Sequence, residues 1–283
     1  MLAPTTEQAK PTLRPGRKRL VRRVLQADPG QEYLVYVPAT ISEKPPLFVS
    51  VHGMSRNADQ HARLLAGYCD IYGAILVAPI FTAEEHPDFQ RLGRVGRGKR
   101  ADIALNLIVA EVSAMTPASG ERFYLFGFSG GAQFAHRYLM ANPHRVAAAV
   151  VAGAGWYTFP DATRRFPFGT RISNKLPDVR FDAEEFLSVP VTVMVGTKDS
   201  TKSGFRRSAR LDGDQGVTRI ARARNWVSAM KASAEAHHLE SRVSFQKISN
   251  GTHSFKQSIL AAGLGEKVFC ALFGPPPVAP NHE

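Results

Sequence analysis

The chain has 283 residues, of which 44% are hydrophobic and 21% are charged. This composition supplies enough apolar material for a substantial core and excludes a mainly disordered chain. The two cysteines, Cys69 and Cys270, exclude a disulfide scaffold and a cysteine-based zinc cluster. The longest apolar runs fall far short of the ~20 residues that a membrane-spanning helix needs, so we expect no membrane span.

Positive charge is in excess, with a formal net charge of +12 at pH 7. It gathers in three separate segments, residues 1–23, 91–100 and 198–210, rather than along one helix face. A nucleic-acid binder concentrates basic residues on one element, so this spacing favours solvated surface and disfavours a nucleic-acid partner. The N-terminal segment lacks the apolar stretch of a secretory signal peptide. We therefore expect a cytoplasmic protein, with a basic organelle-transit segment as the open alternative.

The first elements in chain order are a tail and a hairpin. Prolines and a glycine interrupt residues 1–17, which we interpret as a flexible basic tail. Two short runs with β-propensity follow, Leu20–Gln26 and Glu32–Val37, and Asp28-Pro29-Gly30 lies between them. Proline presets φ and glycine accepts a positive φ, so this tripeptide predicts the turn of an antiparallel hairpin.

From residue 47 onward, buried-strand patterns alternate with helical patterns. Strands are expected at Leu47–Val51, Ala74–Ala78, Arg122–Phe126, Val146–Ala152, Val189–Val195 and Arg242–Ile248, and helices at Ala58–Tyr68, Ala101–Met115, Gly130–Ala141, Thr218–His237 and Ser254–Leu272. The alternation predicts an α/β fold with a mostly parallel central sheet flanked by helices on both faces. The carboxyl ends of the strands then meet at one edge, where ligands bind.

The same pattern predicts one domain over residues 18–274 and a short C-terminal tail at 275–283. Two long connections interrupt the alternation, at residues 81–99 and 155–188. Connections of this length inside a compact domain are commonly functional, and we interpret the second as a lid-like insertion.

The pattern Gly127-x-Ser129-x-Gly131 lies between an apolar strand and a helical run. A strand that turns sharply into a helix strains the backbone at the serine, and only small residues fit two positions away on either side. The turn exposes the Ser129 hydroxyl at the strand tip, beside the positive end of the helix dipole. We therefore predict that Ser129 is a nucleophile; a glycine-rich turn without chemistry is the alternative.

A serine hydroxyl needs a base to take its proton, and the base needs an acid to orient it. For a nucleophile at a strand-to-helix turn, the acid and then the histidine follow the serine along the chain. His253 lies in a loop after the last predicted strand and is the predicted base. Asp199, just past the strand Val189–Val195, is the predicted acid, and Asp161 is its rival because it also lies between the serine and His253.

The negative charge that develops on the substrate carbonyl oxygen requires two N–H donors. The residue after the nucleophile, Gly130, is expected to supply one of them. The second is expected from the loop that follows the strand Leu47–Val51, and we assign it to the N–H of Met54. Gly53 allows the turn that this loop needs.

Four motifs in this order resemble the α/β-hydrolase fold: the strand ending in His52-Gly53, the elbow at Ser129, Gly196-x-x-Asp199 and Gly251-x-His253. The segment Val51–Ala58 is similar to the branch of esterases and polyhydroxyalkanoate-depolymerase-like enzymes, and the likeness covers residues 20–272. The resemblance implies a serine hydrolase that cleaves small-molecule carboxylic esters through an acyl-enzyme, with no metal and no organic cofactor. A peptidase or thioesterase with the same triad remains open, as does a non-catalytic binding protein.

Substrate-pocket candidates come from two places. Trp156 and Tyr157 follow a strand end and either line an acyl or aromatic pocket or pack in the core. Arginine forks match the geometry of a carboxylate. Candidates to face a substrate carboxylate are therefore Arg94, Arg97, Arg206 and Arg207. Asp102 opens a helix and is expected to stabilise its N-terminus, and the sequence indicates no oligomeric state.

Overall fold

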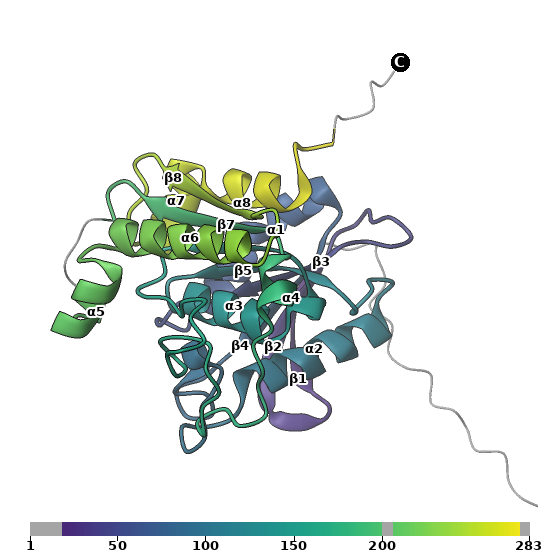
Figure 1. The fold of residues 1–283 in the computed structure, drawn as a ribbon. Helices are drawn as coiled ribbons and strands as arrows, with labels where there is room; N and C mark the ends of the chain where they lie inside the picture. Colours follow the sequence, from purple (N-terminus) through teal and green to yellow (C-terminus); the bar gives the residue numbers. More distant parts are fainter. Residues whose placement is uncertain (1–18, 200–205, 278–283) are drawn as a thin grey trace, which may run out of the picture.

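The computed structural model describes residues 19–199 and 206–277, whose strands form one eight-stranded sheet (Figure 1). The strands are β1 (Arg19–Leu25), β2 (Asp28–Val37), β3 (Leu47–Val51), β4 (Ile75–Ile80), β5 (Phe123–Phe128), β6 (Val146–Ala152), β7 (Val191–Gly196) and β8 (Val243–Ile248). Their order is β1-β2-β4-β3-β5-β6-β7-β8. β2 pairs antiparallel with β1 and with β4, and all later pairs are parallel, which confirms the predicted fold class.

Helices cover both faces of this sheet (Figure 1). One face carries α2 (Ala101–Met115), α3 (Gly130–Ala141), α4 (Ala183–Leu187) and α6 (Arg219–Ala236), and the other carries α1 (Ala58–Tyr72), α7 (Phe255–Ala262) and α8 (Leu264–Phe273). Because both faces are buried, the central strands read as continuous apolar runs. Within the described ranges, no helix is both long and apolar enough to cross a membrane.

The N-terminal hairpin forms as predicted, but its turn lies elsewhere. The chain reverses at Gln26 and Ala27, and Asp28-Pro29-Gly30 belongs to β2. The pairing register with β1 shifts at this point, so the tripeptide lies in a bulge. The Asp28 carboxylate accepts the Gly30 N–H at 3.1 Å and pairs with Lys99 at 3.0 Å. These contacts hold the tripeptide in the strand, and the predicted turn position is wrong.

The predicted helix Ser254–Leu272 is in fact two helices. Gly263 takes a left-handed conformation with φ of 66°, and its N–H bonds the carbonyl of Ser258, which ends α7. α8 begins at the next residue, Leu264. A glycine adopts this conformation without steric strain, so Gly263 ends the helix although the apolar spacing of residues 254–272 predicts a single helix.

The two long connections are structured. Residues 81–100 contain the 3-10 helix η1 (Phe89–Arg91), and a second 3-10 helix, η2 (Pro143–Arg145), precedes β6. The connection at 155–188 packs its apolar side chains inward, with Trp156, Tyr157, Phe166 and Leu176 buried. A helix that the sequence analysis did not predict, α5 (Ala209–Gln215), begins at the end of the third basic segment. The predicted tail at 1–17 and residues 278–283 of the second tail lie outside the described residues.

Four histidines are buried among the residues that the structure describes: His52, His61, His86 and His136. Burial lowers the pKa of His52 and of His86 to about 4, and it lowers the pKa of the other two well below the usual value. The folded protein therefore keeps these imidazoles neutral at a pH at which the unfolded chain protonates them.

We expect the free energy of unfolding to fall as the pH drops from about 6.5 to about 4, because the unfolded state then binds more protons. At pH 5 each buried histidine is expected to lower it by about 2 kcal/mol relative to pH 7.5. Urea unfolding at the two pH values measures the difference. The control variant His144→Gln removes an exposed histidine, leaves the four buried ones in place and should also lose stability at pH 5. Equal stability of the wild type at both pH values would contradict the prediction.

Candidate active site

Ser129 lies at the tip of β5, where the chain turns directly into α3. Its φ of 55° and ψ of −111° place it in a strained conformation that non-glycine residues seldom adopt. The turn is so tight that a Cβ at Gly127 would clash with the carbonyl of Gly131, and one at Gly131 would clash with the carbonyl of Val51. The glycines two positions before and after the serine are thus required by the close approach of the backbone.

Ser129 begins a row of three hydrogen-bonded side chains. Its Oγ lies 2.9 Å from Nε2 of His253, and Nδ1 of His253 lies 2.8 Å from Oδ2 of Asp199. A carboxylate only accepts hydrogen bonds, so Nδ1 carries the imidazole proton and Nε2 can accept the serine hydroxyl. The Asp199 side chain is 1% exposed and that of His253 is 24% exposed, so the row runs from the interior toward solvent.

Two neighbouring strand ends bring Asp199 and His253 together. β7 and β8 are paired in parallel, and the residues that follow them cross at the same edge of the sheet. The Lys198 N–H donates to the carbonyl of Gly251 at 2.8 Å. A Cβ at Gly196 would clash with that same carbonyl, so the two loops touch backbone to backbone.

The rival acid, Asp161, lies in the connection at 155–188. Its Oδ1 accepts the backbone N–H of Thr163 at 2.8 Å and the hydroxyl of the same residue at 2.6 Å. These bonds lower its pKa and use the carboxylate to hold a local turn. The structure thus brings Asp199, and not Asp161, to His253.

The loop after β3 passes beside the serine. A Cβ at Gly130 would lie 3.1 Å from the nitrogen of Met54, and one at Gly53 would lie 3.3 Å from Cβ of Ser129. The two N–H groups expected to bind an oxyanion, those of Gly130 and Met54, therefore lie close to each other and to Ser129.

His52, for which the sequence analysis proposed no role, holds this loop. Its Nε2 accepts the N–H of Phe81 at 3.0 Å, so its Nδ1 is the donor in the 2.9 Å contact with the carbonyl of Gly53. Burial keeps the imidazole neutral by lowering its pKa to about 4. A neutral ring with one donor and one acceptor fixes the backbone immediately before Met54.

Sequence reasoning also missed Arg219, in the first turn of α6. Its Nη1 lies 2.8 Å from Oδ1 of Asp199, and both side chains are 1% exposed. One carboxylate thus bridges a histidine and a buried arginine. No local motif marks Arg219, because the contact is made by the tertiary packing of α6 against the end of β7.

A cavity of about 160 Å³ opens at the serine, and its lining includes Ser129, Met54, Gln133, Trp156, Arg91 and Arg206. Of the two roles that the sequence left open for Trp156, its position in this lining fits the pocket role. The guanidinium carbons of Arg137 and Arg91 lie over its ring, at 4.2 Å and 5.7 Å from the ring centroid.

Tyr157 lies elsewhere. It is fully buried, and its ring stacks on Trp226 with centroids 5.1 Å apart, next to His136. Of the two readings of Tyr157 that the sequence allowed, the structure places it in core packing. Asp102 lies in the first turn of α2, as expected, and pairs with Arg100 at 2.7 Å. Among the described residues, no group of three or more histidine, cysteine, aspartate or glutamate side chains is placed to hold a metal ion.

The sheet order, the flanking helices and the strained serine at the tip of β5 define this protein as an α/β-hydrolase. Residues 31–201 match the family described as esterase PHB depolymerase, and the chain belongs to that family. Both findings confirm the resemblance seen in the sequence and make the chain a hydrolase.

Solved structures agree with this fold. Poly(aspartic acid) hydrolase-1 from Sphingomonas sp. KT-1 is 23% identical, with a TM-score of 0.74, over 91% of this chain and 100% of that one. LpqC, a poly(3-hydroxybutyrate) depolymerase from Bordetella parapertussis, is 23% identical, with a TM-score of 0.75, over 93% of this chain and 92% of that one. S-formylglutathione hydrolase FrmB from Staphylococcus aureus is 12% identical, with a TM-score of 0.57, over 91% and 100%. No curated protein matches the sequence.

Proposed function

We propose that this protein is a serine hydrolase that cleaves carboxylic esters through an acyl-enzyme formed on Ser129. The observation that carries the proposal is the row of hydrogen bonds, 2.9 Å from Ser129 to His253 and 2.8 Å from His253 to Asp199, at a strained strand-to-helix turn. A nucleophile, a base and an orienting acid within hydrogen-bond reach are the requirements for acyl transfer. Membership of an esterase family favours an ester as the substrate.

In the proposed reaction, Oγ of Ser129 attacks the ester carbonyl carbon while Nε2 of His253 takes the hydroxyl proton. The N–H groups of Gly130 and Met54 donate to the oxyanion of the tetrahedral intermediate. His253 then returns the proton to the leaving alcohol, and the acyl group remains on Ser129. Water repeats the attack with His253 as base, which releases the acid and restores the serine. Asp199 accepts the Nδ1–H bond throughout and stabilises the imidazolium.

The experiment is a substrate series with a matched serine control. Wild type, Ser129→Ala and Ser241→Ala, an exposed serine, are assayed with p-nitrophenyl esters of rising acyl length, a p-nitroanilide amide and a thioester. We expect wild type and Ser241→Ala to hydrolyse esters fastest and Ser129→Ala to lose turnover. Faster amide or thioester turnover would replace the ester assignment by one of the two alternatives. Full activity of Ser129→Ala would exclude Ser129 as the nucleophile.

We expect the substrate to be a small molecule rather than a nucleic acid, because the sequence spreads its basic residues over three segments rather than along one helix face. The cytoplasmic location stays a prediction from the sequence. The lid-like role of residues 155–188 also stays a prediction.

Arg219 is proposed to act as a positioning residue through Asp199. We expect Arg219→Gln to lower kcat by about tenfold or more, because the carboxylate loses a buried bond that orients it. Arg219→Lys keeps the charge and a donor and should retain more of the turnover than Arg219→Gln. A merely structural role would reduce the folded fraction of Arg219→Gln and leave the kcat of the folded protein at the wild-type value.

A further inference from the structure

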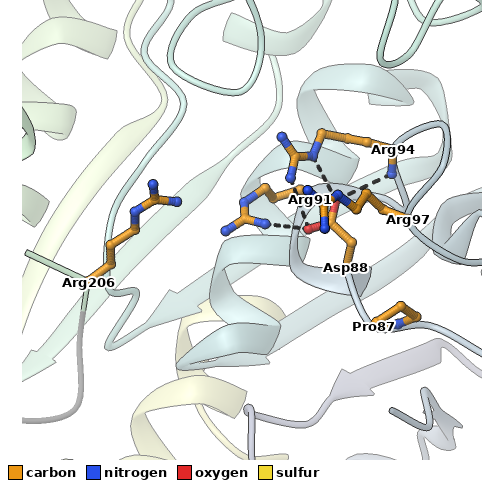
Figure 2. A pocket seen from close by; sticks show the side chains of 6 residues that line it. All are labelled: Pro87, Asp88, Arg91, Arg94, Arg97 and Arg206. Atoms are coloured by element: carbon orange, nitrogen blue, oxygen red, sulfur yellow. Dashed lines mark hydrogen bonds and ion pairs between the residues drawn. The ribbon is translucent and has the colours of Figure 1, made fainter. Parts of the chain in front are cut away.

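A second, strongly basic cavity adjoins the one at Ser129. It has a volume of about 400 Å³ and is lined by Pro87, Asp88, Arg91, Arg94, Arg97 and Arg206 (Figure 2). We call these residues the arginine basin. Arg91 and Arg206 line both cavities, so the basin and the space in front of the serine adjoin at these two side chains.

Charge in the basin is not balanced. Among the described residues that line it, Asp88 is the one acid beside four arginines. Its carboxylate contacts Nη1 of Arg91 and lies 2.7 Å from Nε of Arg94. Within the part of the chain that the structure describes, no carboxylate pairs with Arg97 or Arg206. Burial lowers the pKa of Arg91, the charge and hydrogen bond of Asp88 oppose this shift, and the charges of Arg94 and Arg206 add to it. The guanidinium groups of the basin therefore repel one another, and a bound anion would reduce this repulsion.

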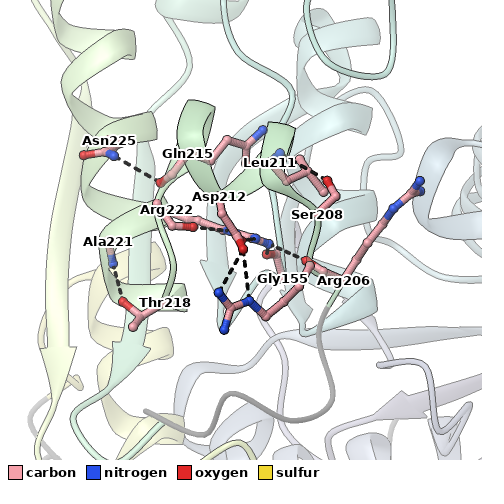
Figure 3. A network of polar contacts seen from close by, with 12 residues as sticks. Gly155, Arg206, Ser208, Leu211, Asp212, Gln215, Thr218, Ala221, Arg222 and Asn225 are labelled. Carbon is pink, nitrogen blue, oxygen red and sulfur yellow. Dashed lines mark hydrogen bonds and ion pairs between the residues drawn. The ribbon is translucent and has the colours of Figure 1, made fainter.

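Arg206 is held in place by a network beneath it (Figure 3). Nη1 of the buried Arg222 donates to the carbonyl of Arg206 at 2.9 Å and to that of Gly155 at 2.6 Å. The other end of the Arg222 guanidinium pairs with Asp212 at 2.7 Å, and Asp212 also binds Arg207 at 2.9 Å. The backbone of Arg206 is thus tied to the residue that precedes Trp156, at the wall of the Ser129 cavity.

These contacts distinguish the four arginines that the sequence analysis named as candidates to face a substrate carboxylate. Arg207 pairs with Asp212 and Arg94 pairs with Asp88, whereas Arg97 and Arg206 form no ion pair with any of the residues that the structure describes. One arginine of the basin already binds a carboxylate at two points, because Nε and Nη2 of Arg94 donate to the two oxygens of Asp88 at 2.7 and 3.3 Å. This two-point contact is the geometry in which arginine binds carboxylates strongly.

We propose that the arginine basin binds a carboxylate of the substrate, so that the enzyme prefers esters whose acyl chain ends in a carboxylate away from the bond that is cleaved. This proposal rests on the proposed function and adds the substrate class. The carbonyl lies at Ser129, the acyl chain follows the cavity past Trp156, and the carboxylate reaches Arg97 and Arg206.

The test compares two acyl groups of the same length, one neutral and one charged. Wild type should show a higher kcat/KM for mono-p-nitrophenyl adipate than for p-nitrophenyl hexanoate. In Arg97→Gln/Arg206→Gln we expect the ratio of the two values to fall by about tenfold or more, because hydrogen bonds to charged groups are lost. Arg63→Gln, an exposed arginine of α1, should leave the ratio unchanged. High salt should reduce the wild-type preference.

A binding measurement separates this proposal from the proposed function. Monomethyl adipate is titrated calorimetrically into Ser129→Ala and into Ser129→Ala carrying both arginine substitutions, which needs no turnover. We expect binding in the first protein and a loss of about tenfold or more in the second. Equal binding, no binding, or an unchanged adipate-to-hexanoate ratio overturns the role of the basin. Discrimination in binding with no hydrolysis of either ester would instead overturn the proposed function and leave the basin as an anion site.

Discussion

Replacing His253 by alanine is expected to lower kcat for ester hydrolysis by about 10⁴- to 10⁶-fold. Its Nε2 lies 2.9 Å from Oγ of Ser129, so without it the hydroxyl proton has no acceptor in the proposed mechanism. The side chain is 24% exposed, so the substitution opens a solvated gap rather than a core cavity. Steady-state hydrolysis of p-nitrophenyl hexanoate measures the loss, and thermal unfolding checks that the fold is kept.

The matched control is His144→Ala, which removes an exposed histidine. We expect it to keep wild-type turnover. Because the serine and the histidine act as one unit, Ser129→Ala/His253→Ala should be no less active than either single variant. A His253→Ala enzyme that retains turnover within about tenfold of wild type would contradict the assignment of the base.

The substitution Asp199→Asn is expected to lower kcat by about 10⁴-fold. Arg219 can only donate, so an asparagine here would turn its carbonyl oxygen toward Arg219 and its NH₂ group toward Nδ1 of His253. Nδ1 would then have to accept, and the imidazole proton would move to Nε2, where it blocks proton transfer from Ser129. The buried arginine thus makes the wrong tautomer the stable one.

The control for this prediction is Asp161→Asn, at the rival position in the connection 155–188. Its carboxylate holds a local turn around Thr163, so we expect turnover close to that of wild type. Stopped-flow or plate assays with the same ester measure both variants. Near-normal turnover of Asp199→Asn together with an inactive Asp161→Asn would show that Asp161, and not Asp199, is the acid.

Much of this fold could be predicted because buried strands and two-faced burial leave clear patterns. The bounds of α2, α3, β3 and β6 agree residue for residue with the prediction. The turn at Ser129 could be recognised because backbone packing leaves no room for a side chain at positions 127 and 131. The turn therefore requires Gly127 and Gly131, and this requirement is visible in the sequence. The order of serine, acid and histidine then pointed to strand ends that the parallel sheet places at one edge.

What could not be predicted depends on contacts between distant segments. The bulge in β2 is fixed in part by Lys99, which lies far along the chain. Arg219 reaches Asp199 only after α6 packs against the sheet, and Tyr157 is drawn into the core by Trp226. The arginine basin combines residues 87–97 with Arg206, so a scan of local charge clusters reads its two halves as separate solvated surface.

The most direct test of the central claim, that Ser129 is an activated nucleophile, is active-site labelling with a fluorophosphonate followed by peptide mapping. The account predicts one phosphonylated residue, Ser129, with labelling absent in Ser129→Ala and strongly slowed in His253→Ala. Labelling of a different residue, or equal labelling rates for wild type and Ser129→Ala, would contradict it.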